Sequence, residues 1–207
     1  MAQKIIRADF NWHGIVTEQQ AKDIMLAVYK TLVTYRGGEF VMTQEVDTSL
    51  NAIAKLMTQP PKKKIGILFS GICGNGKTTM IKCIKETYNY LYSVKMIENY
   101  GEFYICSAKE FAIKSHDYKW FDDTVNKKYL AIDDIGEEAT EIQVYGNIIN
   151  PIVDLIEQRY NKMLPIFITS NLTAPEISNK YGVRVADRLK ECMDIVYFKN
   201  DSFRKTK

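Results

Sequence analysis

A glycine-rich run from Gly71 to Thr78 constrains the fold of this chain more than any other feature of its sequence. The run reads Gly-Ile-Cys-Gly-Asn-Gly-Lys-Thr and fits the pattern G-x-x-x-x-G-K-[ST]. The apolar residues 65–69 come before it and predict a buried strand, and a helical pattern follows from Lys77 to about Tyr92. Because glycine allows several backbone N–H groups to point at one anion, this order of elements predicts a phosphate-binding loop.

The residue types in the loop indicate how a nucleotide would be held. The positive N-terminal end of the following helix adds to the backbone donors. We expect Lys77 to meet the β- and γ-phosphates and Thr78 to hold Mg²⁺. The sequence therefore predicts ATP and Mg²⁺ as cofactors. The predicted nucleotide-binding residues are Gly71, Cys73, Gly74, Asn75, Gly76, Lys77, Thr78 and Thr79.

An apolar strand candidate that ends in two acids supplies the second part of such a site. Residues 129–132 read Tyr-Leu-Ala-Ile, and Asp133 and Asp134 follow. In a Walker B arrangement the first carboxylate supports Mg²⁺ and the second orients or deprotonates the attacking water. A strand ending in Asp-Asp also starts many turns, but its position one strand–helix unit after the loop favours the catalytic interpretation. Since Asp134 is one methylene shorter than glutamate, we expect slow hydrolysis. Glu137 and Glu138 either assist or are solvated loop acids.

Asn171 is a candidate for sensing the γ-phosphate. It follows the strand candidate 165–169, whose C-terminal end should lie beside the third strand or the strand before the glycine-rich loop. An amide there would touch the γ-phosphate or the lytic water. A turn asparagine that ends the strand is the alternative.

Three arginines near the end of the chain are the remaining catalytic candidates. Arg184 and Arg188 share a helix face, because residues four apart are neighbours on a helix. A guanidinium on this face could complete the site of a neighbouring subunit and so make hydrolysis depend on assembly. Local pairing with Asp187 or Glu191 is the alternative, which spacing alone favours. Arg204 lies just past the last strand candidate, which should neighbour the strand before the glycine-rich loop.

Strand and helix patterns alternate after residue 60. The expected strands are residues 65–69, 103–106, 129–132, 165–169 and 195–198. The expected helices are residues 77–92, 107–114, 145–162, 174–181 and 183–191, with Pro151 either kinking the third or starting its main part. This alternation predicts an α/β fold in which helices cover both faces of a five-stranded parallel sheet.

The first 60 residues have a different pattern. Helices are expected from about Thr17 to about Tyr35 and from about Gln44 to Met57, with Gly37-Gly38 between them. We therefore divide the chain into a helical N-terminal region, 1–60, and an ATPase core, 61–207. The N-terminal aromatic side chains form either a partner surface or a small core. These are Trp12, Tyr29, Tyr35 and Phe40.

The composition of the chain indicates a cytoplasmic protein without a membrane span. No stretch approaches the ~18 uninterrupted apolar residues that a membrane span needs, and the first residues lack the apolar core of an export signal. The four cysteines are scattered without a C-x-x-C pair, which argues against zinc and is typical of a reducing cytoplasm. A net charge of +3 is too small to indicate nucleic acid by itself.

Taken together, these runs resemble the DnaC/DnaI/IstB branch of the AAA+ ATPases, which contains bacterial helicase loaders and transposition helper ATPases. The resemblance covers about residues 44–207. The Walker motifs occur in many ATPases, whereas the runs near the two helical arginines and near the last strand are particular to this branch. The runs that carry it are Gly71–Thr78, 130–136, 168–171, 182–189 and 201–204.

The resemblance implies a role for each matching residue. Asp133 would be the Walker B acid and Asp134 the catalytic carboxylate, with Asn171 as sensor I. Arg188 matches the arginine finger, with Arg184 as its companion. Arg204 matches the sensor II arginine. The branch lacks the helical lid of most AAA+ proteins, and this chain likewise ends soon after its fifth strand candidate.

The resemblance also implies partners, namely a replicative DNA helicase, single-stranded DNA and further copies of the chain assembled in ATP. The short N-terminal region departs from the longer helicase-gripping domain of most loaders. Candidate DNA contacts combine a basic groove with an aromatic side chain on which a base can stack, although solvated lysines and a core tryptophan are the plainer interpretation. They are Lys109, Lys114, Lys119 and Trp120.

Two other functions compete with a helicase loader. A transposition helper of the IstB type would use the same core to select target DNA. A P-loop kinase for a small metabolite would show an arginine-rich lid, which the sequence lacks. A replicative, cytoplasmic, ATP-controlled loader is the function that the sequence favours.

Overall fold

The computed structural model describes residues 11–60, 64–98, 100–144 and 147–203. Its helices are α1 (Glu18–Tyr35), α2 (Gln44–Thr58), α3 (Lys77–Ser93), α4 (Ala108–Lys114), α5 (Tyr118–Val125), α6 (Pro151–Lys162), α7 (Ala174–Tyr181) and α8 (Val183–Cys192). Its strands are β1 (Gly66–Gly71), β2 (Phe103–Ser107), β3 (Tyr129–Ile135), β4 (Ile142–Val144), β5 (Asn147–Ile149), β6 (Ile166–Ser170) and β7 (Met193–Phe198).

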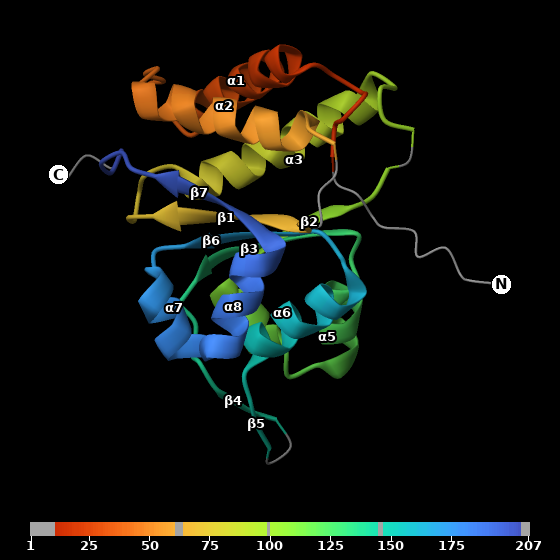
Figure 1. Cartoon of the computed structure of the whole chain (residues 1–207), viewed down its shortest axis with the longest axis vertical. Coiled ribbons are helices and arrows are strands. Elements are labelled where there is room, and N and C mark those ends of the chain that lie inside the picture. The colour runs from red at the N-terminus through yellow and green to blue at the C-terminus, as the bar shows by residue number, and fades with distance from the viewer. Residues whose placement is uncertain (1–10, 61–63, 99, 145–146, 204–207) are drawn as a thin grey trace.

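A five-stranded parallel sheet in the order β2-β3-β6-β1-β7 forms the centre of the molecule. Helices cover both faces, with α1, α2 and α3 on one side and α5, α6, α7 and α8 on the other (Figure 1). The predicted five-stranded α/β fold is therefore confirmed. β6 lies between β3 and β1, and β7 lies on the other side of β1, as expected for the fifth strand. Because these strands are parallel, the C-terminal ends of β1, β3 and β6 lie at the same edge of the sheet, as expected for Asn171.

The buried side chains form one cluster on each face of the sheet. α1 and α2 share a cluster with α3 and with side chains of the sheet. Thr17 starts α1 with the predicted capping box, in which its hydroxyl accepts a hydrogen bond from the Gln20 N–H and the Gln20 side chain accepts one from the Thr17 N–H. The helices of residues 1–60 thus cover one face of the sheet, and the division of the chain at residue 60 stays a prediction about its organisation.

Two parts of the chain differ from the sequence-based prediction. The antiparallel pair β4 and β5 occupies the first part of the helix predicted for 145–162. The helix begins only at Pro151, because Asn150 caps it by accepting a hydrogen bond from the Val153 N–H and proline suits the first helical position. The second difference is α5, which was not predicted. Asp117 caps it by accepting hydrogen bonds from two backbone N–H groups.

Two expected absences concern helices. Within the part of the chain that the structure describes, no helix is long and apolar enough to span a membrane. No helix follows β7 in the described residues, which extend to Phe203.

Candidate nucleotide-binding site

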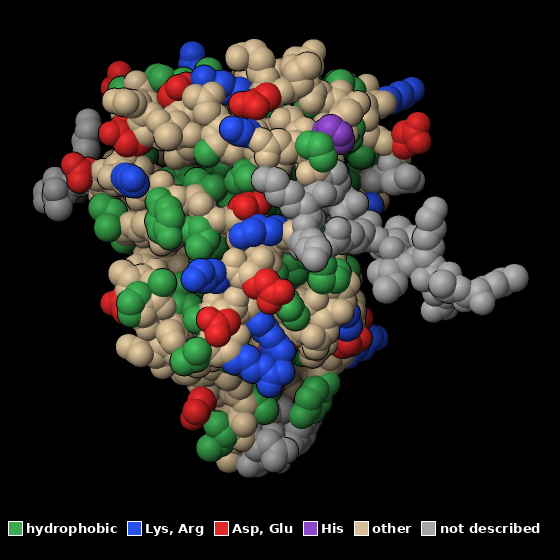
Figure 2. Space-filling view, viewed as in Figure 1, with side chains coloured by type: hydrophobic (Ala, Val, Ile, Leu, Met, Phe, Trp, Pro, Cys, Tyr) green, Lys and Arg blue, Asp and Glu red, His purple; other side chains and the backbone are tan. Residues whose placement is uncertain are grey.

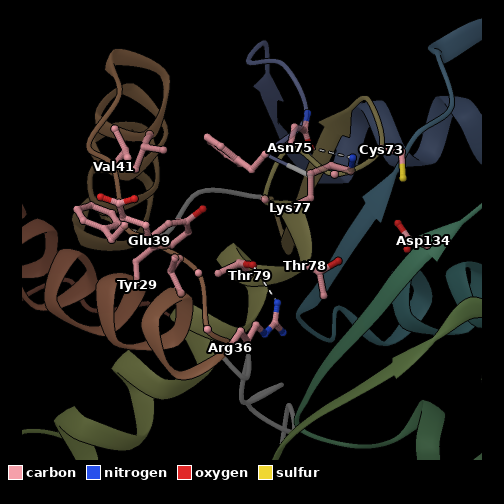
Figure 3. Close-up of a pocket in the computed structure, with 18 of the residues that line it drawn as sticks. Tyr29, Arg36, Glu39, Val41, Cys73, Asn75, Lys77, Thr78, Thr79 and Asp134 are labelled. Atoms are coloured by element: carbon pink, nitrogen blue, oxygen red, sulfur yellow. Dashed lines mark hydrogen bonds between the residues drawn. The ribbon is translucent and has the colours of Figure 1, made fainter. Parts of the chain in front are cut away.

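The glycine-rich loop lies between the end of β1 and the start of α3, as its sequence predicted. Gly74 has φ 81° and Gly76 has φ 97°, in the left-handed region that glycine tolerates. Gly76 is also the N-cap of α3. The loop forms one wall of a cavity of about 700 Å³ (Figure 3). The N-terminal end of α3 and the loop's backbone therefore face a space large enough for a nucleotide.

The ammonium group of Lys77 lies within the loop, and the side chain is buried. Its Nζ donates hydrogen bonds to the carbonyl oxygens of Gly71 at 2.7 Å and Ile72 at 2.6 Å. It also donates to Oδ1 of Asn75 at 3.1 Å and to Oδ1 of Asn171 at 2.8 Å. The predicted sensor asparagine is thus brought to the predicted phosphate-binding lysine, although the two residues are far apart in sequence.

Thr78 and Asp133 form the centre of the predicted magnesium site. The Thr78 hydroxyl donates to Oδ1 of Asp133 at 3.0 Å, and the Thr169 hydroxyl donates to the same oxygen at 2.7 Å. Hydroxyl and carboxylate oxygens are the ligands that Mg²⁺ prefers, and a hydrogen-bonded partner orients the carboxylate. The residues present therefore fit Mg²⁺, and Thr78 and Asp133 are the side chains that would hold it. Thr169 was not predicted.

Asp134 adopts an unusual backbone conformation at the edge of the cavity. Its φ is 58°, and the pairing between β3 and β6 shifts register between Ile132 and Ile135. The Asp134 N–H donates to the Thr169 hydroxyl at 2.7 Å, which fixes this bulge. A positive φ outside glycine is costly, and residues that adopt one cluster at functional sites. The bulge places Asp134 among the residues that line the cavity (Figure 3).

The end of β7 and the residues that follow it are hydrogen-bonded to the glycine-rich loop. The Asn75 amide donates to the Phe198 carbonyl at 3.0 Å, and the Asn200 amide donates to the Asn75 carbonyl at 3.1 Å. The Phe203 N–H donates to the Gly74 carbonyl at 3.0 Å. Asn200 and Phe203 were not predicted as site residues. Arg204, the predicted sensor II residue, lies outside the described residues.

Arg184 and Arg188 share a partner within the chain. Both guanidinium groups pair with Glu157 of α6, Arg184 at 3.5 Å. This partner differs from Asp187 and Glu191, the local partners considered from the sequence. The Arg188 side chain is 13% exposed and lies over the ring of Tyr160, whereas the Arg184 side chain is 75% exposed. Neither arginine lines the cavity.

Glu138 is buried, which corrects the expectation of a solvated loop acid. It accepts a hydrogen bond from the Tyr181 hydroxyl at 2.5 Å and one from the Gly136 N–H at 2.9 Å. Lys180 adds an ion pair at 3.5 Å. Glu138 therefore joins the loop after Asp134 to the end of α7 and lies away from the cavity. Glu137 is exposed, as expected.

Three of the four predicted DNA contacts, Lys109, Lys114 and Trp120, have partners within the chain. Lys109 pairs with Glu137 at 3.4 Å and Lys114 pairs with Glu110 at 2.7 Å. Trp120 packs with Phe111 in the cluster on the α6 side of the sheet. On the face shown in Figure 2, basic and acidic side chains are interspersed rather than separated. Within the described residues, these contacts favour a structural role for Trp120.

Residues between α1 and α2 form the other wall of the cavity. Arg36 and Val41 line it, together with Tyr29 of α1 (Figure 3). Phe40 lines it as well. The sequence predicted only a partner surface or a small core for this region. Their place follows from the packing of α1 on α3, which no motif in residues 1–60 indicates.

Strand β1, the loop that follows it and the Thr78–Asp133 pair define the P-loop NTPase fold. No protein-family model matches the chain. No curated protein matches it in sequence.

Solved structures share this fold. The DnaC helicase loader aligns with a TM-score of 0.56 and 20% identity over 78% of this chain and 94% of that chain. DnaI aligns with a TM-score of 0.61 and 16% identity over 88% and 93%. AMPPCP-bound DnaA from Aquifex aeolicus aligns with a TM-score of 0.55 and 16% identity over 78% of this chain and 49% of that chain. The chain thus shares its fold with the DnaC helicase loader and DnaI.

Proposed function

We propose that this chain is an ATP-hydrolysing AAA+ protein of DNA replication that loads a replicative helicase onto single-stranded DNA in the cytoplasm. The observation that carries the ATPase part is the convergence of three groups at one sheet edge: Lys77 bonded to Asn171, Thr78 bonded to Asp133, and Asp134 at the cavity. Motifs from separate strands meet there as nucleotide hydrolysis requires.

The residues at this edge divide the chemistry between them. Mg²⁺, when bound, would neutralise charge on the phosphate oxygens. Lys77 and the N–H groups of the loop would bind the phosphates. Asp134 would orient the attacking water and accept its proton, and Asn171 would hold that water or the γ-phosphate in place.

An arginine from a neighbouring copy would complete the site in an ATP-dependent assembly. Arg184 and Arg188 lie on α8, outside the cavity of their own chain, which supports a role in trans. The exposure of Arg184 favours it as the residue that reaches the neighbour, while Arg188 positions α8 through Glu157. Arg204, which follows β7 in the sequence, would act as sensor II.

The replicative partner is proposed from the solved structures of the same fold, which include the DnaC helicase loader and DnaI. Mass photometry of the chain mixed with the replicative helicase of its host, with and without ATP, tests the proposal. We expect a complex that forms with ATP and is lost in Lys77→Ala. Self-assembly on DNA in ATP, without a helicase complex, would instead indicate the transposition helper.

A further inference from the structure

Arg36 places a guanidinium group at the wall of the cavity, beside the first turn of α3. It is the C-cap of α1, and its N–H bonds to the carbonyls of Val33 and Thr34, so its backbone is held by the helix. Its Nη1 donates to the hydroxyl of Thr79 at 3.3 Å, which joins the end of α1 to the first turn of α3 (Figure 3). Both residues line the cavity.

Buried contacts fix α1 against the glycine-rich loop, so the backbone from which Arg36 extends has a defined position. A Cβ added at Gly76 would meet the Tyr29 hydroxyl at 2.8 Å, which shows how closely α1 approaches the loop. The Cys83 thiol of α3 donates to the Met25 carbonyl of α1 at 3.2 Å. Arg36 is therefore presented to the cavity by a packed helix.

The charge of Arg36 is not neutralised by a carboxylate in the described part of the chain, where no ion pair includes it. Glu39 lines the same cavity, but its carboxylate points away from Arg36 (Figure 3). The pKa of Lys82, one turn along α3, is lowered first by burial and then by the charge of Arg36. An anion bound in the cavity would therefore meet an uncompensated positive charge.

We infer that Arg36 is a phosphate ligand of the nucleotide, contributed in cis by the helices before the ATPase core. This inference rests on the proposed function. Thr78 faces Asp133 and the magnesium side, whereas its neighbour Thr79 faces Arg36. Arg36 thus lies on the side of α3 away from the magnesium ligands, next to a loop whose backbone would cradle the α- and β-phosphates. The ligand is the α-phosphate, and nucleotide binding ties α1 to the glycine-rich loop.

Competition binding against a fluorescent ADP tests this assignment with ATP, ADP, AMP and adenosine. Arg36→Ala should weaken ATP, ADP and AMP by roughly tenfold to a hundredfold, the range for a lost hydrogen bond to a charged group. Adenosine binding should not change, because adenosine has no phosphate. Arg36→Lys should lose less than Arg36→Ala, because it keeps the charge. Lys30→Ala, an exposed change on the same helix, is the matched control.

Thermal unfolding without nucleotide checks that the variants fold, and Arg36→Gln replaces Arg36→Ala if the latter unfolds early. Wild-type affinity for ATP in the folded variant would overturn the inference and leave the proposed function intact. An equal loss for adenosine would also overturn it, because the contact would then be to the nucleoside. Failure of the wild-type chain to bind ATP would instead overturn the proposed function itself.

Discussion

At the scale of single residues, the motifs identify the chemistry but not the groups that orient it. Lys77, Thr78 and Asp133 follow from the sequence because their spacing to strand and helix is specific. Thr169 does not, because its hydrogen bond to Asp133 depends on how β6 pairs with β3. The position of Arg36 at the cavity likewise could not be predicted, because it depends on the packing of α1 on α3. Short-range patterns carry no information about such long-range partners.

Because the thiol of Cys83 is buried, we expect the fold to lose stability as the pH rises into the alkaline range. Burial raises the pKa of Cys83 from 9.0 to about 12. Since the folded pKa exceeds the unfolded one, this contribution is fully present below pH 9 and is lost progressively between pH 9 and about 12. Between pH 8 and pH 10, the free energy of unfolding of the wild type should fall by about 1 kcal/mol more than that of Cys83→Ala, as measured by urea unfolding.

The matched control is Cys73→Ala, because Cys73 is exposed in the loop. This variant should keep the pH dependence of the wild type. Burial also raises the pKa of Tyr29 to about 12, so a part of the alkaline loss above pH 10 should persist in Cys83→Ala. Equal pH dependence of Cys83→Ala and the wild type between pH 8 and 10 would contradict the burial of this thiol.

At the scale of helices and strands, α8 carries two arginines with different expected roles. Arg188 is mostly buried between Glu157 and Tyr160, whereas Arg184 is mostly exposed. Arg188→Ala should lower the free energy of unfolding by about 1–3 kcal/mol, because it leaves Glu157 without its closer partner. Arg184→Ala should change it by less than about 0.5 kcal/mol. Chemical denaturation measures both.

The ATPase assay separates the two roles in the assembled protein. Arg184→Ala should reduce assembly-stimulated turnover by about a thousandfold, the scale of a lost arginine finger, and leave ATP binding by the monomer unchanged. Arg184→Lys is the conservative control, and it should recover only part of the turnover because a lysine cannot make the bidentate contact. Loss of ATP binding by the Arg184→Ala monomer would contradict the proposal that Arg184 acts on the site of a neighbouring copy.

The strands and most helices could be predicted because hydrophobic periodicity and caps are local signals. The five strands of the main sheet lie within a few residues of their predicted positions. The β4–β5 pair could not be predicted, because residues 142–149 mix apolar and polar types without a clear period. α5 begins at the cap formed by Asp117, and a single aspartate before a short helix is a weak signal in the sequence.

At the scale of the whole molecule, the nucleotide cavity joins parts of the chain that the sequence separates. Its walls come from the turn between α1 and α2, the glycine-rich loop and the ends of β3 and β6. The α/β core was predictable from alternating strands and helices. The contribution of the first 60 residues to the cavity was not predictable, because it arises from packing across one face of the sheet.

The central claim is that this cavity binds ATP with Mg²⁺, and isothermal titration calorimetry tests it most directly. The account predicts saturable binding of one ATP per chain, weakened when Mg²⁺ is chelated, because Thr78 and Asp133 would then lose the ion that links them to the phosphates. Lys77→Ala should abolish this binding and still unfold cooperatively. No binding by the wild-type chain, or equal binding by Lys77→Ala, would contradict the account.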